Sequence, residues 1–286
     1  MTLRRSQMDR RALFTSAAAM ALLAASGVSA AGAPQRGGRL RMALSGGLRD
    51  DTWVSGDGLF MQVARQGMVF DTLTERAADG VLRGELATGW QSSDGGRIWH
   101  LELRADVFFH DGQRFASRDV VESLQNLPGA RVAAVGPLAV RITLDQPSAA
   151  LPLVLAEPEY IIRPAHTPDA GIGTGIYRVK RFLPGRQLLT ERVETHYKDG
   201  AAGWFDEVEL TSIPSERVRG EALGAYLVDA VDTRDADALE GVADVVLLPD
   251  ARAVMQAVST TVAQPARVSA LRPLDDLRAA ERWWFV

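Results

Sequence analysis

The chain has 286 residues, of which 47% are hydrophobic and 24% are charged, so it has the composition of a globular protein rather than of a disordered or collagen-like one. It contains no cysteine, which excludes disulfides, zinc–cysteine sites, iron–sulfur clusters, a thiol nucleophile and a lipid anchor on cysteine. Its formal net charge of -4 offers no argument for nucleic acid as a partner.

Residues 1–30 have the parts of an export signal. The first 11 residues carry four arginines, and the stretch from Ala12 to Ala30 is uncharged, rich in alanine and closed by small residues. Such a weakly apolar run suits a cleaved signal better than a membrane anchor. The pair Arg10-Arg11 resembles a twin-arginine signal, and an ordinary Sec signal is the alternative. Removing four arginines and one aspartate with this segment leaves a net charge of -7. We expect a soluble, unanchored protein in a bacterial periplasm.

The rest of the chain mixes strand and helix patterns. Alternating hydrophobic residues predict strands at 39–44, 98–104, 138–144, 160–162, 176–182, 186–192, 207–213, 230–231 and 245–248. Helical spacing and capping residues predict helices at 59–76, 118–127 after an N-cap at Ser117, 149–156, 216–225 and 250–262, and a break near Gly67 is the alternative to one continuous helix at 59–76. A strict βαβ rhythm is missing, so we expect an α/β or mixed α+β fold with a mixed sheet.

Catalytic and metal-binding patterns are weak. The four histidines, at 100, 110, 166 and 196, have no metal-ligand spacing, and the sequence contains neither HExxH nor GxSxG nor a P-loop. His110-Asp111 falls in a predicted turn, where aspartate is favoured for backbone hydrogen bonding. The glycine-rich run 171–175 precedes a strand rather than a helix, which favours a tight turn with close backbone approach over a phosphate cradle. We therefore expect no enzyme activity, no catalytic residues, no metal and no cofactor.

Candidate ligand contacts come from the loop that follows the first strand. Trp53, Asp57 and Phe60 lie in or beside this polar loop, and an aromatic residue at a strand's carboxyl end is well placed to line a cleft. Glu159 and Tyr160 lie at another predicted strand end. For each aromatic residue, burial in the core is the alternative to ligand contact.

Several segments in a fixed order resemble one family. These segments are GGRLRMA (37–43), DTLTE (71–75), GELATGWQSSDGGRIWHLELRADVFFHDGQRFASRDVVESL (84–124), GTGIYRV (173–179), FDEVELTSIP (205–214) and ALGAYLVDAV (222–231). Together they resemble the family 5 extracellular solute-binding proteins, the peptide/nickel-type receptors of ABC importers. The resemblance implies a lobe like those of type II periplasmic binding proteins, a peptide-like solute or a metal chelate as ligand, and an ABC permease and ATPase as partners.

The resemblance also implies a longer chain than this one. Family members are usually much longer, with a second lobe that this sequence does not match, so we expect residues 31–235 to form one lobe. Residues 236–286 are expected to form a short return segment and tail. A single lobe cannot close around a solute by itself. The alternative is therefore an accessory protein that keeps the fold but binds a protein partner, and Trp283, Trp284 and Phe285 are the candidates for that contact.

Overall fold

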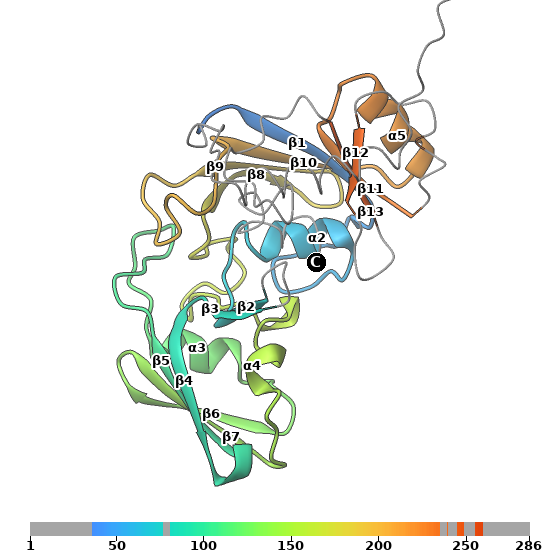
Figure 1. Ribbon diagram of the computed structural model, residues 1–286. Helices are drawn as coiled ribbons and strands as arrows, with labels where there is room; N and C mark the ends of the chain where they lie inside the picture. The colour runs from blue at the N-terminus through green and yellow to red at the C-terminus, as the bar shows by residue number, and fades with distance from the viewer. Residues whose placement is uncertain (1–35, 77–80, 235–238, 240–244, 249–254, 260–286) are drawn as a thin grey trace, which may run out of the picture.

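The computed structural model describes residues 36–76, 81–234, 239, 245–248 and 255–259 (Figure 1). These residues form one part around a seven-stranded sheet and a second part around a four-stranded sheet, with a short two-stranded ribbon between them. The predicted export signal and the C-terminal aromatic residues Trp283, Trp284 and Phe285 lie outside the described residues.

The seven-stranded sheet has the order β12-β13-β11-β1-β10-β9-β8. Its strands are β1 (Arg39–Leu44), β8 (Tyr177–Leu183), β9 (Gln187–Arg192), β10 (Glu207–Ser212), β11 (Ala230–Thr233), β12 (Val245–Leu248) and β13 (Met255–Ser259). Strand β1 is parallel to both of its neighbours, β10 and β11, whereas the other pairs are antiparallel. The mixed sheet and the α+β class expected from the sequence are confirmed.

The four-stranded sheet is antiparallel, with the order β4-β5-β7-β6. Its strands are β4 (Ala87–Ser93), β5 (Ile98–Leu103), β6 (Ala130–Gly136) and β7 (Ala139–Leu144), and the ribbon consists of β2 (Thr74–Arg76) and β3 (Leu82–Gly84). In β5, Trp99, Leu101 and Leu103 are buried and His100 and Glu102 are exposed, which is the alternation that predicted this strand.

The helices are short. They are α2 (Leu59–Arg65), α3 (Ser117–Ser123), α4 (Leu151–Val154) and α5 (Glu216–Gly224), with 3-10 turns η1 (Asp94–Gly96) and η2 (Pro158–Tyr160). Ser215 caps α5 as predicted, since its side chain accepts a hydrogen bond from the Val218 amide. Within the described ranges, we find no helix with the length and apolar character needed to cross a membrane.

Several local predictions need correction. The helix expected at 59–76 ends at Arg65, and the alternative of a break near Gly67 is confirmed, because Gly67 turns the chain with a φ of 79°. No strand forms at 160–162, where η2 ends at Tyr160, and the helix expected at 250–262 contains β13. Ser117 is not the N-cap of α3; the cap is Ala116, whose amide donates to the Asp119 carboxylate, and the Ser117 hydroxyl donates to the Gly136 carbonyl.

Helices α2 and α5 cover opposite faces of β1. Because successive strand residues point to opposite faces, Met42 and Leu44 pack in one core cluster with Phe60 of α2, whereas Ala43 packs in another cluster with Leu223 of α5. A third cluster fills the space under the four-stranded sheet, around Trp99, Leu101 and Val140. The middle of the large sheet therefore has an α/β character, with helices on both faces.

A glycine-rich turn brings two segments of backbone together as predicted. A methyl group placed on Gly173 would lie 1.7 Å from the Val69 carbonyl oxygen, and one on Gly175 would lie 2.2 Å from that of Met68. Only glycine permits this approach. The prediction of close backbone approach at 171–175 is confirmed, and the turn fixes the entry to β8.

A buried ionic cluster ties the chain after β9 to the ribbon. The Lys198 ammonium lies 3.1 Å from Glu75 Oε2 and 3.9 Å from Asp71 Oδ1, and it also contacts the Glu85 carboxylate. Burial would raise the pKa of Asp71, but hydrogen bonding with His196 and the charge of Lys198 hold that pKa well below its usual range. In this cluster, formed by Asp71, Glu75, Glu85 and Lys198, the one ammonium contacts all three carboxylates inside the fold.

Candidate functional site

The carboxyl ends of three parallel strands meet at one edge of the large sheet. Strand β1 ends at Leu44, β10 at Ser212 and β11 at Thr233. The chain leaves β1 towards α2 on one face and reaches β11 through α5 on the other. In open α/β sheets, ligands bind outside the carboxyl ends of the strands, at the point where the connections of neighbouring strands lie on opposite faces of the sheet. This edge is therefore the first place to look for a solute site.

One polar group at this edge is fully occupied by the fold. Asp232 accepts hydrogen bonds from the Ser45 amide at 2.8 Å and the Ser45 hydroxyl at 2.7 Å, and its carboxylate lies 3.1 Å from Arg219 Nε. Arg219 also donates to the carbonyls of Ile213 and Pro214. Because these buried groups satisfy one another, they hold α5 and β11 to β1 and offer nothing to a solute.

The loop between β1 and α2 is closed on itself at its base. The Phe60 amide donates to the Ser45 carbonyl at 3.1 Å, and a methyl group on Gly58 would lie 1.8 Å from the Gly46 carbonyl oxygen. Asp51 folds back inside the loop, where its carboxylate accepts a hydrogen bond from the Leu48 amide at 2.7 Å. Burial raises the pKa of Asp51. The loop is thus a fixed wall rather than a loose connection.

The five predicted ligand residues divide into core and surface positions. Phe60 is fully buried in α2, and Trp53 is 7% exposed. The Trp53 ring packs against Phe182, with centroids 4.6 Å apart, and against Phe70, at 5.9 Å. Asp57 and Glu159 are exposed, and Tyr160 is partly buried.

The structure brings the two predicted groups together around an arginine that sequence reasoning missed. Arg65, the last residue of α2, is 9% exposed and donates to the carbonyls of Met61, at 3.3 Å, and Gly56. Burial lowers the pKa of Arg65, and the charges of Asp57, Asp51 and Glu159 oppose that shift. The neighbouring Gln66 side chain donates to the Ala156 carbonyl at 2.8 Å, so the loop after β1 and the segment after α4 both contact the end of α2.

Arg163 is the second arginine in this region. Its charge adds to the lowering of the Arg65 pKa, and burial lowers its own pKa as well. Its Nε is buried and has no hydrogen-bond partner among the described residues. In the sequence, Arg65 is a charged residue at the end of an apolar helical run, and Arg163 is an arginine between two apolar segments. Neither pattern is specific to a functional residue.

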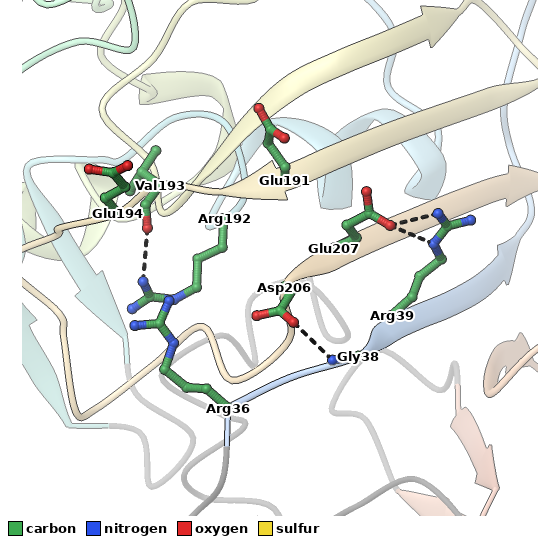
Figure 2. A pocket seen from close by; sticks show the side chains of 9 residues that line it. All are labelled: Arg36, Gly38, Arg39, Glu191, Arg192, Val193, Glu194, Asp206 and Glu207. Carbon is green, nitrogen blue, oxygen red and sulfur yellow. Dashed lines mark hydrogen bonds and ion pairs between the residues drawn. The ribbon is translucent and has the colours of Figure 1, made fainter.

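Neither Arg65 nor Arg163 lines either of two cavities in the described part of the chain. One, of about 310 Å³, lies between the ends of β6 and β7 and the α4–η2 segment and has Tyr160 in its lining. The other, of about 550 Å³, lies at the amino ends of β1 and β10 (Figure 2). The larger cavity is lined by charged side chains and backbone from Arg36, Gly38, Arg39, Glu191, Arg192, Val193, Glu194, Asp206 and Glu207.

Internal bonds occupy much of the charge in the larger cavity. Arg39 binds Glu207 through two hydrogen bonds of 2.8 and 2.6 Å, Arg192 donates to the Val193 carbonyl at 2.9 Å, and the Gly38 amide donates to Asp206. None of the residues predicted to bind ligand lines this cavity. It lies at the opposite ends of the strands from the carboxyl edge.

Three of the four histidines, His110, His166 and His196, make hydrogen bonds within the fold. His110 Nε2 donates to the Gly175 carbonyl at 2.7 Å, since a carbonyl can only accept, and its Nδ1 accepts from the Gly173 amide. Burial lowers the pKa of His110, in agreement with this neutral tautomer. His166 lies 2.9 Å from the Asp111 carboxylate on the surface. In the part of the chain that the structure describes, we find no group of three or more acidic or histidine side chains that could hold a metal.

Comparison with known proteins assigns the family. The family model described as bacterial extracellular solute-binding proteins, family 5 middle, matches residues 81–256. The uncharacterized protein YhjP of Bacillus subtilis strain 168 is 32% identical over 156 residues, which cover 50% of this chain and 26% of YhjP.

Solved structures agree with this match. The PBP AgaA from A. tumefaciens R10, in complex with agropinic acid, has a TM-score of 0.66 and 25% identity over 74% of this chain and 48% of AgaA. The oligopeptide-binding protein AppA of Bacillus subtilis, in complex with a nonapeptide, has a TM-score of 0.64 and 19% identity over 75% of this chain and 48% of AppA. NikZ of Campylobacter jejuni, in complex with Ni(L-His), has a TM-score of 0.62 and 22% identity over 73% of this chain and 46% of NikZ.

The chain spans about half the length of these solved relatives. Family 5 proteins are non-enzymatic receptors of ABC importers that are typically extracellular or periplasmic, and the fold of this chain matches their lobes. The resemblance drawn from the sequence segments is confirmed. The chain belongs to the bacterial extracellular solute-binding proteins of family 5.

Proposed function

We propose that this chain is a non-catalytic, substrate-binding component of an ABC importer. In this role it binds a peptide or a related small solute, such as a metal chelate, in the periplasm and delivers the solute to a permease and ATPase complex. The observation that supports the proposal is the pair of contacts at the end of α2, where Arg65 donates to the Gly56 carbonyl of the loop after β1 and Gln66 donates to the Ala156 carbonyl after α4. The ligands of AppA and NikZ, a nonapeptide and Ni(L-His), support this substrate range.

The proposed solute site uses Asp57, Glu159 and Tyr160 as contacts from the two converging segments. Trp53 and Phe60 belong to the same proposed site as its supporting wall, because their rings are buried behind the loop. A solute bound to this wall would be recognised by charged and aromatic groups on fixed backbone.

Thermal melting tests the proposed function. The purified chain is melted with pooled peptides, free metal ions and metal chelates, and a pool that raises the melting temperature contains a ligand of the native state. A positive pool is then divided until one solute remains, and its affinity is measured by calorimetry. No shift with any pool, in a protein that melts cooperatively, contradicts solute binding.

Exposed apolar side chains favour a second candidate function, that of an accessory lobe which binds another periplasmic protein. Leu48 is 56% exposed and Val54 is 45% exposed, and both lie on the loop that borders the proposed site. Residues 283–285, with two tryptophans and a phenylalanine, would add to such a contact. A stable co-purifying protein that is lost when Trp283–Val286 is deleted, together with no solute binding, would favour this function.

The export proposal has its own test. Residues 1–30 would direct the chain to the periplasm, and replacing Arg10 and Arg11 together with lysine would trap a twin-arginine substrate in the cytoplasm while leaving Sec export intact. Cell fractionation distinguishes the two routes.

A further inference from the structure

The smaller of the two cavities, of about 310 Å³, has an apolar floor. Leu127, Leu144 and Leu151 line it, are between 4% and 8% exposed, and belong to the core cluster under the four-stranded sheet. Val154 of α4 and Tyr160 of η2 are half-buried, pack on the same cluster and add to the apolar lining. Ligand pockets have volumes of about 300–1,000 Å³ and mostly apolar walls, so this cavity has the size and lining of a site for a small molecule.

The rim of the cavity is polar and carries a single charge. Its residues are Pro128, Gly129, Asp145, Gln146 and Ser148. The Asp145 amide donates to the Gly129 carbonyl at 2.8 Å, and Asp145 Oδ2 would lie 3.8 Å from a methyl group placed on Gly129. The Asp145 carboxylate itself is exposed and makes no hydrogen bond or ion pair with a described residue. It is therefore available to a ligand at the mouth of the cavity.

Two further acids lie beside the cavity. The Tyr160 amide donates to the Glu157 carbonyl at 3.0 Å, and Glu159 precedes Tyr160 in η2. Burial raises the pKa of the Tyr160 hydroxyl, and the charges of Glu159 and Glu157 add to that shift. The hydroxyl is thus neutral, and it makes no hydrogen bond with a described residue. Together with Asp145 at the rim, these acids make the surroundings of the cavity negative.

No positive charge offsets these acids inside the cavity, since none of the described residues that line it is basic. Arg131 lies opposite Thr143 in the sheet, so its side chain projects from the face opposite to that of Leu144. The Arg97 carbonyl accepts from the Leu144 amide at 2.8 Å, but the Arg97 guanidinium lies 3.8 Å from the Asp94 carboxylate. The cavity therefore favours a cationic ligand over an anionic one.

We propose that this cavity binds a small primary amine with an apolar body, such as an arylalkylamine. The apolar body lies on the floor formed by Leu127, Leu144 and Leu151, and the ammonium group donates charge-assisted hydrogen bonds to Asp145. The ring of Tyr160 adds an aromatic surface to which a cation is attracted. This site goes beyond the proposed import function, because it belongs to the part built around the four-stranded sheet and shares only Tyr160 with the proposed solute site.

The test uses phenethylamine as the probe. Its binding to the purified chain is titrated by ligand-observed NMR, with three comparison compounds at matched ionic strength. Phenylethanol keeps the ring without the charge, ethylamine keeps the charge without the ring, and phenylacetate reverses the charge. We expect phenethylamine to bind about fivefold more tightly than phenylethanol, and the other two compounds to bind more weakly than either. No binding of phenethylamine overturns the site, and equally tight binding of phenylethanol or phenylacetate overturns the cationic assignment.

Variants assign the amine to this cavity. Asp145→Asn should weaken phenethylamine binding about fivefold and leave phenylethanol binding unchanged, because only the charge is removed. Val154→Trp should fill the cavity and abolish the binding of both compounds. Glu194→Gln is the matched control, because Glu194 is an exposed carboxylate that lines the larger cavity, and this variant should bind the amine as the parent does. Amine binding that is unchanged in Asp145→Asn, or that is lost in Glu194→Gln, overturns the proposal.

The melting temperature separates ligand binding from a structural role. Asp145→Asn should melt at the temperature of the parent, since the carboxylate makes no bond with a described residue. A clear loss of stability means that Asp145 supports the fold, and it overturns the role of Asp145 as a ligand contact. If phenethylamine binds but no pooled solute does, the site stands and the import function fails; if a pooled solute binds and phenethylamine does not, the function stands and the site fails.

Discussion

The molecule contains two groups of buried charge that differ in how they are neutralised. In the cluster of Asp71, Glu75, Glu85 and Lys198, the single ammonium contacts three carboxylates. In the second group, Arg65 and Arg163 have no ion pair with a described residue. The first group joins distant parts of the chain, and Arg65 of the second lies at the end of α2, which contacts the loop after β1 and the segment after α4.

This difference indicates which charges the fold uses for itself. A buried ion pair contributes to a scaffold only when its partners satisfy each other, because desolvation must be offset within the protein. Arg65 is held instead by the carbonyls of Met61 and Gly56, and its charge is opposed only through space, by Asp57, Asp51 and Glu159.

Replacing Lys198 with methionine should have the largest effect. Lys198→Met leaves three carboxylates around an apolar side chain, and breaking a buried ionic group in this way destabilises proteins by about 3–5 kcal/mol. Chemical denaturation measures the change in the free energy of unfolding.

Lys180→Met is the matched control, because Lys180 is the only other lysine and forms exposed ion pairs with Glu191 and Glu207. Exposed pairs contribute about 0–1 kcal/mol, so this variant should remain close to the parent. If both variants change the free energy of unfolding equally, the Lys198 cluster stabilises the fold no more than an exposed ion pair does.

Trp53→Ala should destabilise the chain by about 3 kcal/mol, because the buried ring contacts Phe70 and Phe182. Val54→Ala, at the exposed neighbouring position, should change stability by less than about 0.5 kcal/mol. If Trp53→Ala is as stable as the parent but no longer binds solute, Trp53 contacts the ligand directly instead of supporting the fold.

Acid should weaken the Lys198 cluster and spare Arg65 and Arg163. Because the folded-state pKa of Asp71 is well below its usual value of 3.8, folding stability from this group is complete above that value and is lost as pH falls below it. The melting temperature of the parent should therefore decline as the pH falls below about 4. In Lys198→Met this decline should be smaller, and an unchanged decline would mean that other carboxylates control acid unfolding.

The sequence predicted the scaffold better than the site. Strands such as β5 could be predicted because each buries one face, so that hydrophobic residues alternate along the strand. Strand β6 was not predicted, since its residues are partly exposed on both faces and its pattern carries no alternation. The helix expected at 59–76 was too long because the hydrophobic residues after Gly67 are buried in a turn. In a turn, the spacing of buried residues does not follow the helical period.

The proposed site depends on contacts that local sequence patterns do not contain. Asp57 could be chosen from its position in a loop and Glu159 from its position at a predicted strand end. Arg65 and Arg163 are 98 positions apart, and the effect of one charge on the other follows only from the folded structure. The environment of Lys198 is equally hidden, since its carboxylate partners lie more than one hundred residues away. The sequence around an arginine does not show whether a carboxylate will form an ion pair with it in the fold.

The smallest expected effect concerns the exposed acids whose charges act on Arg65. Asp57→Asn and Glu159→Gln should each leave the free energy of unfolding within about 0.5 kcal/mol of the parent, because both side chains are exposed. Asp94→Asn, at an exposed aspartate in η1 beside the four-stranded sheet, is the control and should change the free energy of unfolding equally little. A loss of stability in Asp57→Asn or Glu159→Gln that Asp94→Asn does not share would mean that these acids offset the charge of Arg65 within the fold.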